Sequence, residues 1–508
     1  MKGIRALLLL GVTAFFYMAS GACGNPAPTD VRLPAVEGKF YPQDPQKLKQ
    51  AIQQFLQDSK VFPLENPIAL VAPHAGYIYG GQIAADAYRQ VMGRSYDVIV
   101  ILGVNHTTAG FSGVSLSDYQ AFRTPLGDIP VDEKIIAALL SECRDCTRDR
   151  AVHVREHSIE VQLPFVQVLF PKAKIVPAIL HPADFNMCTR FGQALAKVLK
   201  GRRALIVISS DLSHYPDSEN AAKADRATLK AIATLDPGKV ASLMRDLSLP
   251  NLDTRACGEA SILAGLTAAK ALGATRAVVV GYANSGDVPV GDRSRTVGYG
   301  AMVLAPGSSQ SDTKILDRAA PRSKAIPLRD TEKMLLLKLA RSTIQRYLST
   351  ETVPLARNFP ARLEFPQGAF VTVKKDGHLR GCIGHMLPDC ELCKMVSAMA
   401  LLAAFDDPRF PPLQMGELGN IEIEISVLTP MKSIASPDEI KVGRDGIHIS
   451  KAGKSAVFLP QVATENNWDR TEMLENLCVK GAMPAGCWKQ NASLQIFQAD
   501  VFSESQFR

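Results

Sequence analysis

The sequence predicts a three-layer α/β domain built around a mostly parallel sheet, followed by a smaller α+β domain. Residues 31–305 alternate between short apolar segments and amphipathic ones, the pattern of a parallel sheet covered by helices on both faces. From residue 329 the pattern changes to apolar segments joined by tight-turn signals, which is typical of antiparallel hairpins. Residues 306–328 are rich in proline, serine and charge, and we expect a linker there.

Apolar segments of the first domain, residues 31–305, predict its strands. The segment VIVILG (98–103) is apolar without alternation and rich in β-branched residues, as in strands that are buried on both faces. The other expected strands are residues 68–72, 174–180, 204–210, 276–283 and 296–305. Helical patterns lie between them, for example at 46–57 and 237–247, so most of these strands are expected to run parallel.

The second domain, residues 329–508, starts with a helical pattern that Asp330 and Thr331 are placed to cap. A hairpin is expected next, with Asp376-Gly377 as its turn. Residues 421–430 alternate strictly between apolar and polar, which predicts a strand with one wet face. A second hairpin is expected to turn at Ala452-Gly453, so this domain is predicted to be largely antiparallel.

Length and charge restrict the class of function. The chain has 508 residues, more than one ordinary domain, and its formal net charge of +7 is mild over that length. It contains neither a run of basic residues nor an alternation of basic and aromatic ones. We therefore expect no nucleic-acid partner and instead a small-molecule substrate whose identity the sequence does not give.

Residues 1–30 read as a signal peptide and tether. A basic start, MKGIR, precedes the apolar segment from Ala6 to Ala19, and small residues lead to Cys23. Cys23 after Ser-Gly-Ala resembles a bacterial lipoprotein box, although Ser20 replaces its usual leucine. We expect an exported protein, periplasmic or anchored as a lipoprotein in a bacterium, that meets the membrane only through this end. Cleavage without lipidation and an uncleaved signal anchor are the alternatives.

The cysteines are interpreted in the light of export. In an oxidising compartment, disulfides are favoured over redox or zinc sites. We expect at least two disulfides from three pairs, which are Cys143–Cys146, Cys390–Cys393 and Cys478–Cys487. A four-cysteine zinc site is a weaker alternative, because the two C-x-x-C pairs lie in different halves of the chain.

Residues able to bind a metal follow several strands of the first domain. His74 follows residues 68–72, His106 follows 98–103, and Asp211 and His214 follow 204–210. The carboxyl ends of parallel strands share one edge of the sheet, so these side chains are expected to converge. Cys257 lies just before an apolar helical run. Two imidazoles with a thiolate or carboxylate make a suitable metal site, and the alternative is a set of ordinary polar loop residues.

The first domain resembles the Memo family, whose bacterial members are labelled AmmeMemoRadiSam system protein B. The motifs that carry the resemblance over residues 31–305 are RLPAVEGKFYP, APHAGYIYGG, ILGVNH, RTPLGDIPVD, REHSIEVQLPF, SSDLSHY, ACGEASI, NSGD and VGYGAM. The fold of that family is similar to class III extradiol dioxygenases, which hold non-haem iron. The family's usual proline before the asparagine of ILGVNH is Val104 here, which affects the shape of the loop.

The resemblance implies roles for individual residues. His74, His106 and Cys257 would hold one transition metal ion, with iron or copper expected and zinc as a further option. His214 matches the acid/base histidine of the dioxygenases, and Asp211 beside it would fix its tautomer. A thiolate is softer than a carboxylate and shifts the preference toward Cu(I) or zinc.

The segment HVREH (153–157) offers a competing reading, since it fits the H-x-x-E-H pattern of inverted zinc proteases. In that reading His153 and His157 lie one helical turn apart and Glu156 acts between them. In the Memo pattern only Glu156 and His157 belong to the motif. We expect His157 to line the catalytic pocket and His153 to be a solvated surface residue. Tyr77 and Tyr79 are expected to serve packing more than the pocket.

The second domain resembles the AMMECR domain, labelled AmmeMemoRadiSam system protein A, over residues 329–508. The matching motifs are GAFVTVKKDGHLRGCIG, AAFDDPRFPPL, IEISVLTP, FLPQVATENNW and LENLCVKGAMPAGCWK. Arg380 and Cys382 mark a candidate pocket. As a nucleophile, Cys382 would need an activating base, for which His385 is the nearest candidate, and a buried thiol is the alternative. Arg380 and Asp407 are expected either to bind an anion or to form an ion pair.

The leading hypothesis is an exported metal-binding fusion of the two domains, with a dioxygenase-like site for redox or oxygenase-type chemistry. One alternative is a non-catalytic copper- or iron-binding or scaffold protein, and a less favoured one is a zinc hydrolase that uses HVREH. The family label also suggests a radical SAM partner. Such enzymes are cytosolic, so an exported chain is not expected to meet one directly.

Overall fold

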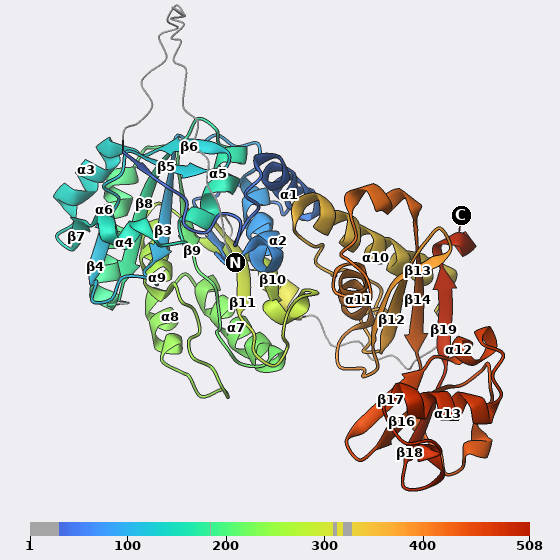
Figure 1. Cartoon of the computed structure of the whole chain (residues 1–508). Coiled ribbons are helices and arrows are strands. Elements are labelled where there is room, and N and C mark those ends of the chain that lie inside the picture. The colour runs from blue at the N-terminus through green and yellow to red at the C-terminus, as the bar shows by residue number, and fades with distance from the viewer. Residues whose placement is uncertain (1–29, 183, 308–311, 318–327, 508) are drawn as a thin grey trace, which may run out of the picture.

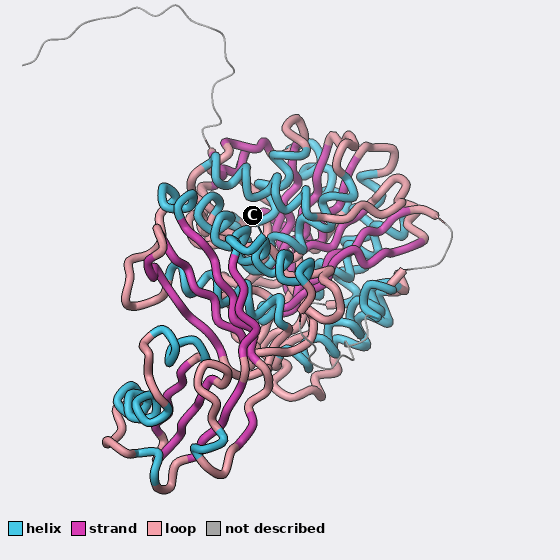
Figure 2. Tube along the Cα trace, turned by 90° about the vertical axis from the view of Figure 1, so that its right-hand side faces the viewer, coloured by secondary structure: helices cyan, strands magenta, loops and turns pink. Residues whose placement is uncertain are grey.

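The computed structural model describes residues 30–182, 184–307, 312–317 and 328–507, which form two domains that lie side by side (Figures 1 and 2). The expected signal peptide and tether, apart from Asp30, lie outside the described residues, as does much of the expected linker. Within the described ranges, no helix has both the length and the hydropathy that crossing a membrane requires.

The first domain is built on one mixed sheet whose centre is parallel. Its strand order is β10-β11-β2-β9-β3-β8-β4-β7. The strands are β2 (Ala69–Ala72), β3 (Val98–Val104), β4 (Gly113–Leu116), β7 (Cys146–Arg148), β8 (Lys174–His181), β9 (Ala204–Ser209), β10 (Arg276–Asn284) and β11 (Gly298–Ala305). The neighbours β2, β9, β3 and β8 run parallel, whereas β10, β11 and β4 join antiparallel. The predicted parallel centre is therefore confirmed, and it has antiparallel flanks.

Helices cover both faces of this sheet and give three layers (Figure 1). Successive residues of a strand point to opposite faces. On β3, Leu102 lies against Gly265 of α9, whereas Gly103 lies against Ser158 and Ile159 on the other side. The helices are α1 (Pro45–Asp58), α2 (Tyr77–Tyr88), α3 (Glu133–Glu142), α4 (Arg150–Val154), α5 (Leu163–Leu169), α6 (Phe185–Leu199), α7 (Ser218–Ala233), α8 (Pro237–Met244) and α9 (Glu259–Ala271).

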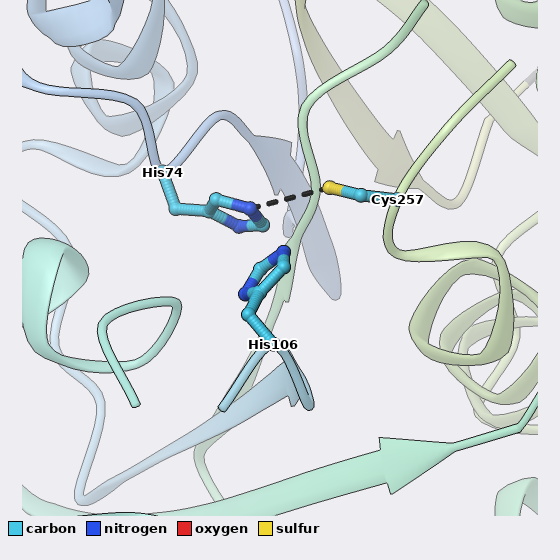
Figure 3. A group of neighbouring side chains, drawn as sticks. All are labelled: His74, His106 and Cys257. Carbon is cyan, nitrogen blue, oxygen red and sulfur yellow. Dashed lines mark hydrogen bonds between the residues drawn. The ribbon is translucent and has the colours of Figure 1, made fainter. Parts of the chain in front are cut away.

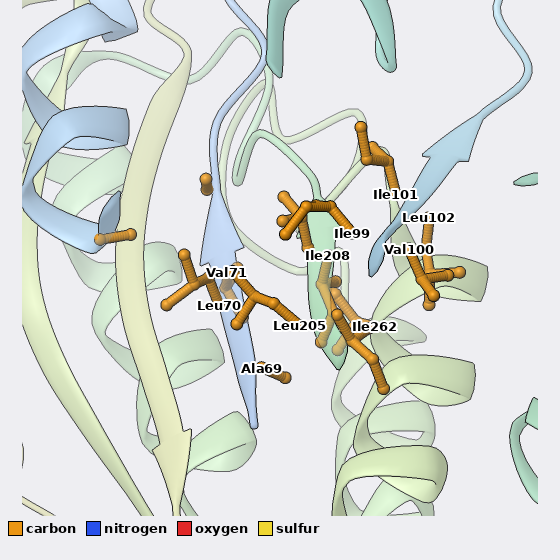
Figure 4. Close-up of a cluster of buried hydrophobic side chains, with 14 of the residues drawn as sticks. Ala69, Leu70, Val71, Ile99, Val100, Ile101, Leu102, Leu205, Ile208 and Ile262 are labelled. Atoms are coloured by element: carbon orange, nitrogen blue, oxygen red, sulfur yellow. The ribbon is translucent and has the colours of Figure 1, made fainter. Parts of the chain in front are cut away.

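The core of the first domain lies between these layers. All seven residues of β3 and all four of β2 are buried, which matches their unbroken apolar sequence. Figure 4 shows Leu70, Val71 and Leu102 beside Ile208 of β9 and Ile262 of α9. Burial of apolar surface of this kind is the main term that stabilises a domain of this size.

The N-terminal segment of the domain is held by a buried ion pair that the sequence did not indicate. A small sheet joins β1 (Val31–Arg32), β5 (Ala121–Thr124) and β6 (Gly127–Pro130). The guanidinium of Arg32 forms an ion pair with Glu160, and both side chains are buried. Glu160 also accepts hydrogen bonds from the backbone of Ala35 and Val36, so its charge is fully satisfied. A pair of this kind ties residues 31–36 to the short 3-10 helix Glu160–Gln162 that precedes α5.

The second domain has two cores rather than one. The first contains the sheet β13-β12-β14-β19 with α10 and α11, and the second contains the sheet β15-β18-β16-β17 with α12 and α13. The strands are β12 (Ala369–Lys375), β13 (His378–His385), β14 (Ile421–Leu428), β15 (Lys432–Ser433), β16 (Gly446–Lys451), β17 (Lys454–Phe458), β18 (Ser493–Phe497) and β19 (Ala499–Ser503). The helices are α10 (Asp330–Thr350), α11 (Leu392–Phe405), α12 (Pro460–Glu465) and α13 (Arg470–Lys480).

Both predicted hairpins of the second domain are confirmed. β12 and β13 pair antiparallel, with Asp376 at φ 50° and Gly377 at φ 79° in the turn. β16 and β17 pair around Ala452 and Gly453, which also have positive φ. Two successive positive φ values are the geometry of the turn that suits the twist of paired strands.

Two of the three expected disulfides are formed, and the third is not. Cys143 is bonded to Cys146, and Cys478 to Cys487. The pair Cys390–Cys393 was wrong, because both residues are free thiols. Cys393 is buried in the first turn of α11, where it belongs to the core of the second domain, and Cys390 packs against that core. These two cysteines therefore serve as small apolar side chains.

The two domains are joined by ion pairs as well as by the chain. Arg357 of the second domain forms a bidentate pair with Asp86 of α2, whose carboxylate is 2% exposed. At the other end of the contact, Lys394 of α11 lies 2.8 Å from Asp287. More exposed pairs, such as Lys47 with Glu351, surround the first contact. The buried pair is the interaction that the docking of the domains most depends on, because its charges cannot be solvated separately.

We predict that Arg357→Ala lowers the midpoint of the first unfolding transition in scanning calorimetry. Loss of one partner leaves the Asp86 carboxylate buried and unpaired, which costs about 3 kcal/mol. The exposed pair of Lys47 and Glu351, whose side chains are 40% and 50% exposed, supplies the control. Lys47→Met is expected to change stability by less than about 1 kcal/mol. Equal effects of the two substitutions would show that the Arg357 pair has no special role.

We predict that four cysteines escape alkylation when the exported, unreduced chain is labelled in denaturant. They are Cys143, Cys146, Cys478 and Cys487, because a disulfide does not react with a thiol reagent. Cys390 and Cys393 are expected to be labelled under the same conditions. Peptide mass spectrometry reads each site. Protection of Cys390 and Cys393 in denaturant would contradict the structure.

Candidate metal centre

Three side chains converge at the carboxyl edge of the parallel strands, as Figure 3 shows. His74 follows β2, His106 follows β3, and Cys257 lies just before α9. Gly258 allows the approach of Cys257, because a Cβ there would lie 2.6 Å from the Ser210 side chain. The expected convergence of these residues is therefore what the structure shows.

A hydrogen bond to Ser209, whose hydroxyl is itself bonded to the Ser158 carbonyl, fixes the tautomer of His74. The Ser209 hydroxyl donates to the Ser158 carbonyl at 2.6 Å, so its oxygen can only accept from His74 Nδ1, which lies 3.1 Å away. The ring proton therefore sits on Nδ1, and Nε2 carries a lone pair. That nitrogen lies 3.2 Å from Cys257 Sγ. Burial of the ring lowers the pKa of His74, which keeps the imidazole neutral.

Glu156 orients His106 in the same way. Its Oε1 lies 2.9 Å from His106 Nδ1, so the ring donates there and leaves Nε2 free. The carboxylate also accepts from the backbone N–H groups of His106, His157 and Ser158. Burial alone would raise the pKa of Glu156, but the hydrogen bonds from the side chain and backbone of His106 lower it to about 2. Glu156 is thus a permanent anion behind the ring.

The resulting donor set suits a metal ion. The ligand atoms of His74, His106 and Cys257 all lie within 4.8 Å of one another. Both imidazoles present a lone pair and hold their proton on the far nitrogen, as metal-bound histidines do. The His74 side chain is 2% exposed and the His106 side chain 28%, so a ligand would approach from the His106 side. Three protein donors leave coordination positions open, as in catalytic sites.

His157 borders this open side. Its ring stacks on His106 with centroids 4.6 Å apart and lies 5.4 Å from the His74 ring. Its Nδ1 is 3.4 Å from Glu156 Oε1, and His106, Glu156 and His157 form a second group within metal-binding distance. Glu156 in that group already accepts several N–H donors, so its function there is to orient the rings. His157 therefore lies next to the donor set, and a catalytic role for it stays a prediction.

Asp211 and His214 lie beside the donor set, but Asp211 does not form the expected hydrogen bond with the His214 ring. Asp211 Oδ1 accepts from the backbone N–H of His74 at 2.8 Å and of Ala75 at 3.2 Å. Among the described residues, no hydrogen bond joins Asp211 to the His214 ring, so the expectation that Asp211 fixes its tautomer was wrong. The Nε2 atom of His214 is buried without a partner. Burial raises the pKa of Asp211 and lowers that of His214.

The reading of HVREH as a zinc motif was wrong. Helix α4 ends at Val154, so His153 and His157 do not share a helical face. His153 is also not a surface residue: it is 1% exposed, and its Nε2 lies 3.1 Å from the Ser115 carbonyl. Burial lowers its pKa to about 4. The local sequence did not indicate the burial of His153, because that burial comes from the N-terminal segment and strand β4, which pack over α4.

Tyr77 serves packing, as expected. It is 2% exposed, donates its hydroxyl to the Val161 carbonyl, and packs against Tyr41 and Phe165. Tyr79 lies partly buried against the same core. Sequence reasoning missed Ser158 and Ser209. Ser209 is the last residue of β9 and Ser158 lies in the turn after α4, and a serine in either place is too common to indicate such a role.

In the second domain Arg380 and Asp407 each form an ion pair, but with other partners and not with each other. The Arg380 guanidinium binds both carboxylate oxygens of Glu417 at 3.1 and 3.0 Å. Asp407 pairs with Arg409 and accepts the Cys382 backbone N–H at 2.8 Å. Thr372 donates to Cys382 Sγ at 3.3 Å.

His385 was considered as the base that would activate Cys382. It pairs instead with Asp389 at 2.8 Å, and within the described ranges no hydrogen bond links it to Cys382. The arrangement therefore shows a thiol in a hairpin beside ion pairs, without an activating base in contact.

A family model described as Memo-like protein matches residues 32–303, and one described as AMMECR1 matches residues 337–502. The chain is 39% identical over 291 residues to the MEMO1 family protein of Methanocaldococcus jannaschii, which covers 54% of this chain and 99% of that protein. The MEMO1 family protein of Aquifex aeolicus is 36% identical over 278 residues, again with 54% and 99% coverage.

Among solved structures, an uncharacterized protein from Pyrococcus horikoshii is 36% identical, with a TM-score of 0.34 and coverage of 35% of this chain and 93% of that one. An uncharacterized protein from Escherichia coli is 13% identical with a TM-score of 0.32, and covers 47% and 98%.

We predict that His153→Gln removes the loss of folding stability that His153 causes as the pH falls from 6.5 to 4. The folded pKa of about 4 lies below the ordinary value of 6.5, so unfolding takes up a proton between these pH values. The stabilisation is therefore complete above pH 6.5 and is lost as the pH falls to 4, by about 3 kcal/mol for this residue. Urea unfolding of both proteins at several pH values measures it, and parallel pH profiles would contradict the burial of a neutral His153.

Proposed function

The chain belongs to the Memo-like family through its first domain and carries an AMMECR1 domain after it, and from this we propose that it is a metal-binding protein with one redox-active centre. The observation that carries the proposal is the convergence of two oriented imidazoles and a thiol within 4.8 Å. We propose oxygenase-type or other redox chemistry on a small-molecule substrate.

His74 Nε2, His106 Nε2 and Cys257 Sγ would hold the ion. Iron or copper suits two imidazoles and a thiolate, and zinc is a further candidate. When bound, such an ion supplies a Lewis acid and, for iron or copper, a one-electron couple. The chain's own contribution is orientation: Ser209 and Glu156 hold the two rings with their lone pairs toward the thiol.

The environment of Cys257 favours a neutral thiol in the protein alone. Burial, with Asp211 nearby, raises the pKa of the thiol above its ordinary value. The thiol proton can therefore be donated to His74 Nε2 at 3.2 Å until a cation replaces it. Loss of that proton on binding makes affinity for the ion fall as the pH falls.

His214 and His157 are the groups proposed to move protons. Burial keeps His214 neutral, and its unpartnered Nε2 can accept a proton from a substrate bound beside the donor set. His157 faces the open side through its stacking on His106, and a lowered pKa, again from burial, keeps it neutral as well. Asp211 acts through the backbone of His74, so it is a positioning residue.

A non-catalytic role in copper or iron binding, or as a scaffold, is the second candidate. The thiol donor favours it, because soft ligands stabilise Cu(I), and storage or transfer of that ion needs no proton-transfer group. The two candidate functions differ in the role of His214: the redox proposal needs it for turnover, and the binding or scaffold proposal does not.

We also propose that the protein works outside the cytosol, in the periplasm or as a lipoprotein. The disulfides Cys143–Cys146 and Cys478–Cys487 support an oxidising compartment. A direct radical SAM partner is not expected there.

We predict that Cys257→Ser reduces bound iron or copper at least tenfold, measured by elemental analysis of the purified full-length protein. A hydroxyl replaces the thiolate and supplies neither its charge nor its softness. Cys382→Ser is the matched control, since Cys382 is also a partly buried free thiol, and it should leave metal content unchanged. Stoichiometric metal in the triple variant of His74, His106 and Cys257 would show that the ion binds elsewhere.

His214→Ala separates the two candidate functions. If the redox proposal holds, the His214→Ala variant still binds the metal but has no turnover. In the binding or scaffold proposal the wild-type protein shows no turnover, and the substitution changes neither metal content nor metal transfer.

A further inference from the structure

A pocket of about 320 Å³ lies where the two domains meet, away from the candidate metal centre. The first domain contributes residues that follow α1, one residue of α2 and part of β10, and the second contributes Arg357 and Asn358. Ligand pockets often occur at domain interfaces, and this volume is at the lower end of their usual range. The lining residues are Lys60, Phe62, Asp86, Val280, Tyr282, Ile315, Arg357 and Asn358.

One end of the pocket is built by a local distortion of β10. The register of β10 against β11 shifts between Val279 and Gly281, as at a β-bulge. A Cβ on Gly281 would lie 2.4 Å from Asp86 Oδ2, so only glycine admits the carboxylate there. Bulges of this kind are common where a strand borders a functional site. Asp86 in turn holds Arg357 in place from the other domain.

The walls of the interdomain pocket are apolar, and the charged side chains that line it sum to a positive charge. Phe62, Val280 and Ile315 present only carbon, and Tyr282 presents its ring, because its hydroxyl is donated to Asp225. Arg357 and Asp86 cancel each other's charge.

Lys60 provides the positive charge. Its Nζ donates to the amide oxygen of Asn358 at 3.0 Å, a neutral partner, and the described residues give it no carboxylate. A ligand that matches this pocket has an apolar body and one negative charge.

We propose that the interdomain pocket binds a small amphipathic monoanion, such as a medium-chain carboxylate, with its apolar body against Val280 and Tyr282 and its anionic group at Lys60. Such a ligand would contact both domains. The site shares no residue with the candidate metal centre, so its occupancy does not depend on the proposed function.

The test is isothermal titration of the full-length protein with octanoate, and with n-octanol and octylamine as neutral and cationic analogues. We expect octanoate to bind at least tenfold more tightly than either analogue. Lys60→Gln should weaken octanoate binding about tenfold, and Lys49→Gln, on the exposed face of α1, should not change it.

Ile315 gives a second and independent variant, because its side chain is 37% exposed and tolerates a charge. Ile315→Glu should weaken octanoate binding and Ile315→Lys should not. The proposal is overturned if octanoate does not bind at millimolar concentration, if the three probes bind equally, or if Lys60→Gln and Ile315→Glu leave the affinity unchanged.

Discussion

The carboxylate of Glu156 is the constraint on which the geometry of the candidate centre depends. It is fully buried, yet it stays ionised because the His106 ring and consecutive backbone N–H groups donate to it. A buried anion tolerates few arrangements, since each lost donor costs more than an ordinary hydrogen bond. Ser158, two residues on, bonds the backbone of Val104 at the end of β3, so the loop and the strand are fixed together.

Much of the first domain could be predicted because its information is local. Unbroken apolar segments predicted the strands, and the rule that parallel strands end at one edge predicted that His74 and His106 lie together. Cys257 precedes α9 and follows no strand, so it entered the predicted set through the family resemblance. The failures involve contacts between distant segments. Arg32 and Glu160 are 128 residues apart, and the burial of His153 depends on β4, which carries no strong strand signal. The orientation of Asp211 toward His74 also depends on exact backbone geometry, which residue type does not specify.

In the second domain, too, features set by local sequence were predictable and features set by distant contacts were not. Its hairpins were predictable because Asp376-Gly377 and Ala452-Gly453 have turn chemistry that needs no other part of the chain. Its two cores were not, because β19 pairs with β14 across the intervening subdomain, and no local pattern shows that separation. Cys390 and Cys393 were misread for a related reason: their spacing suggests a disulfide, but α11 buries one thiol in the core of the domain.

The ion pairs between the domains have a consequence for how the molecule moves. With Arg357 held by a buried carboxylate and Lys394 held at the far end of the contact, rotation of one domain against the other requires charges to be separated in a poorly solvated region. The described parts of both domains should therefore diffuse through solution as one elongated particle with a single rotational correlation time.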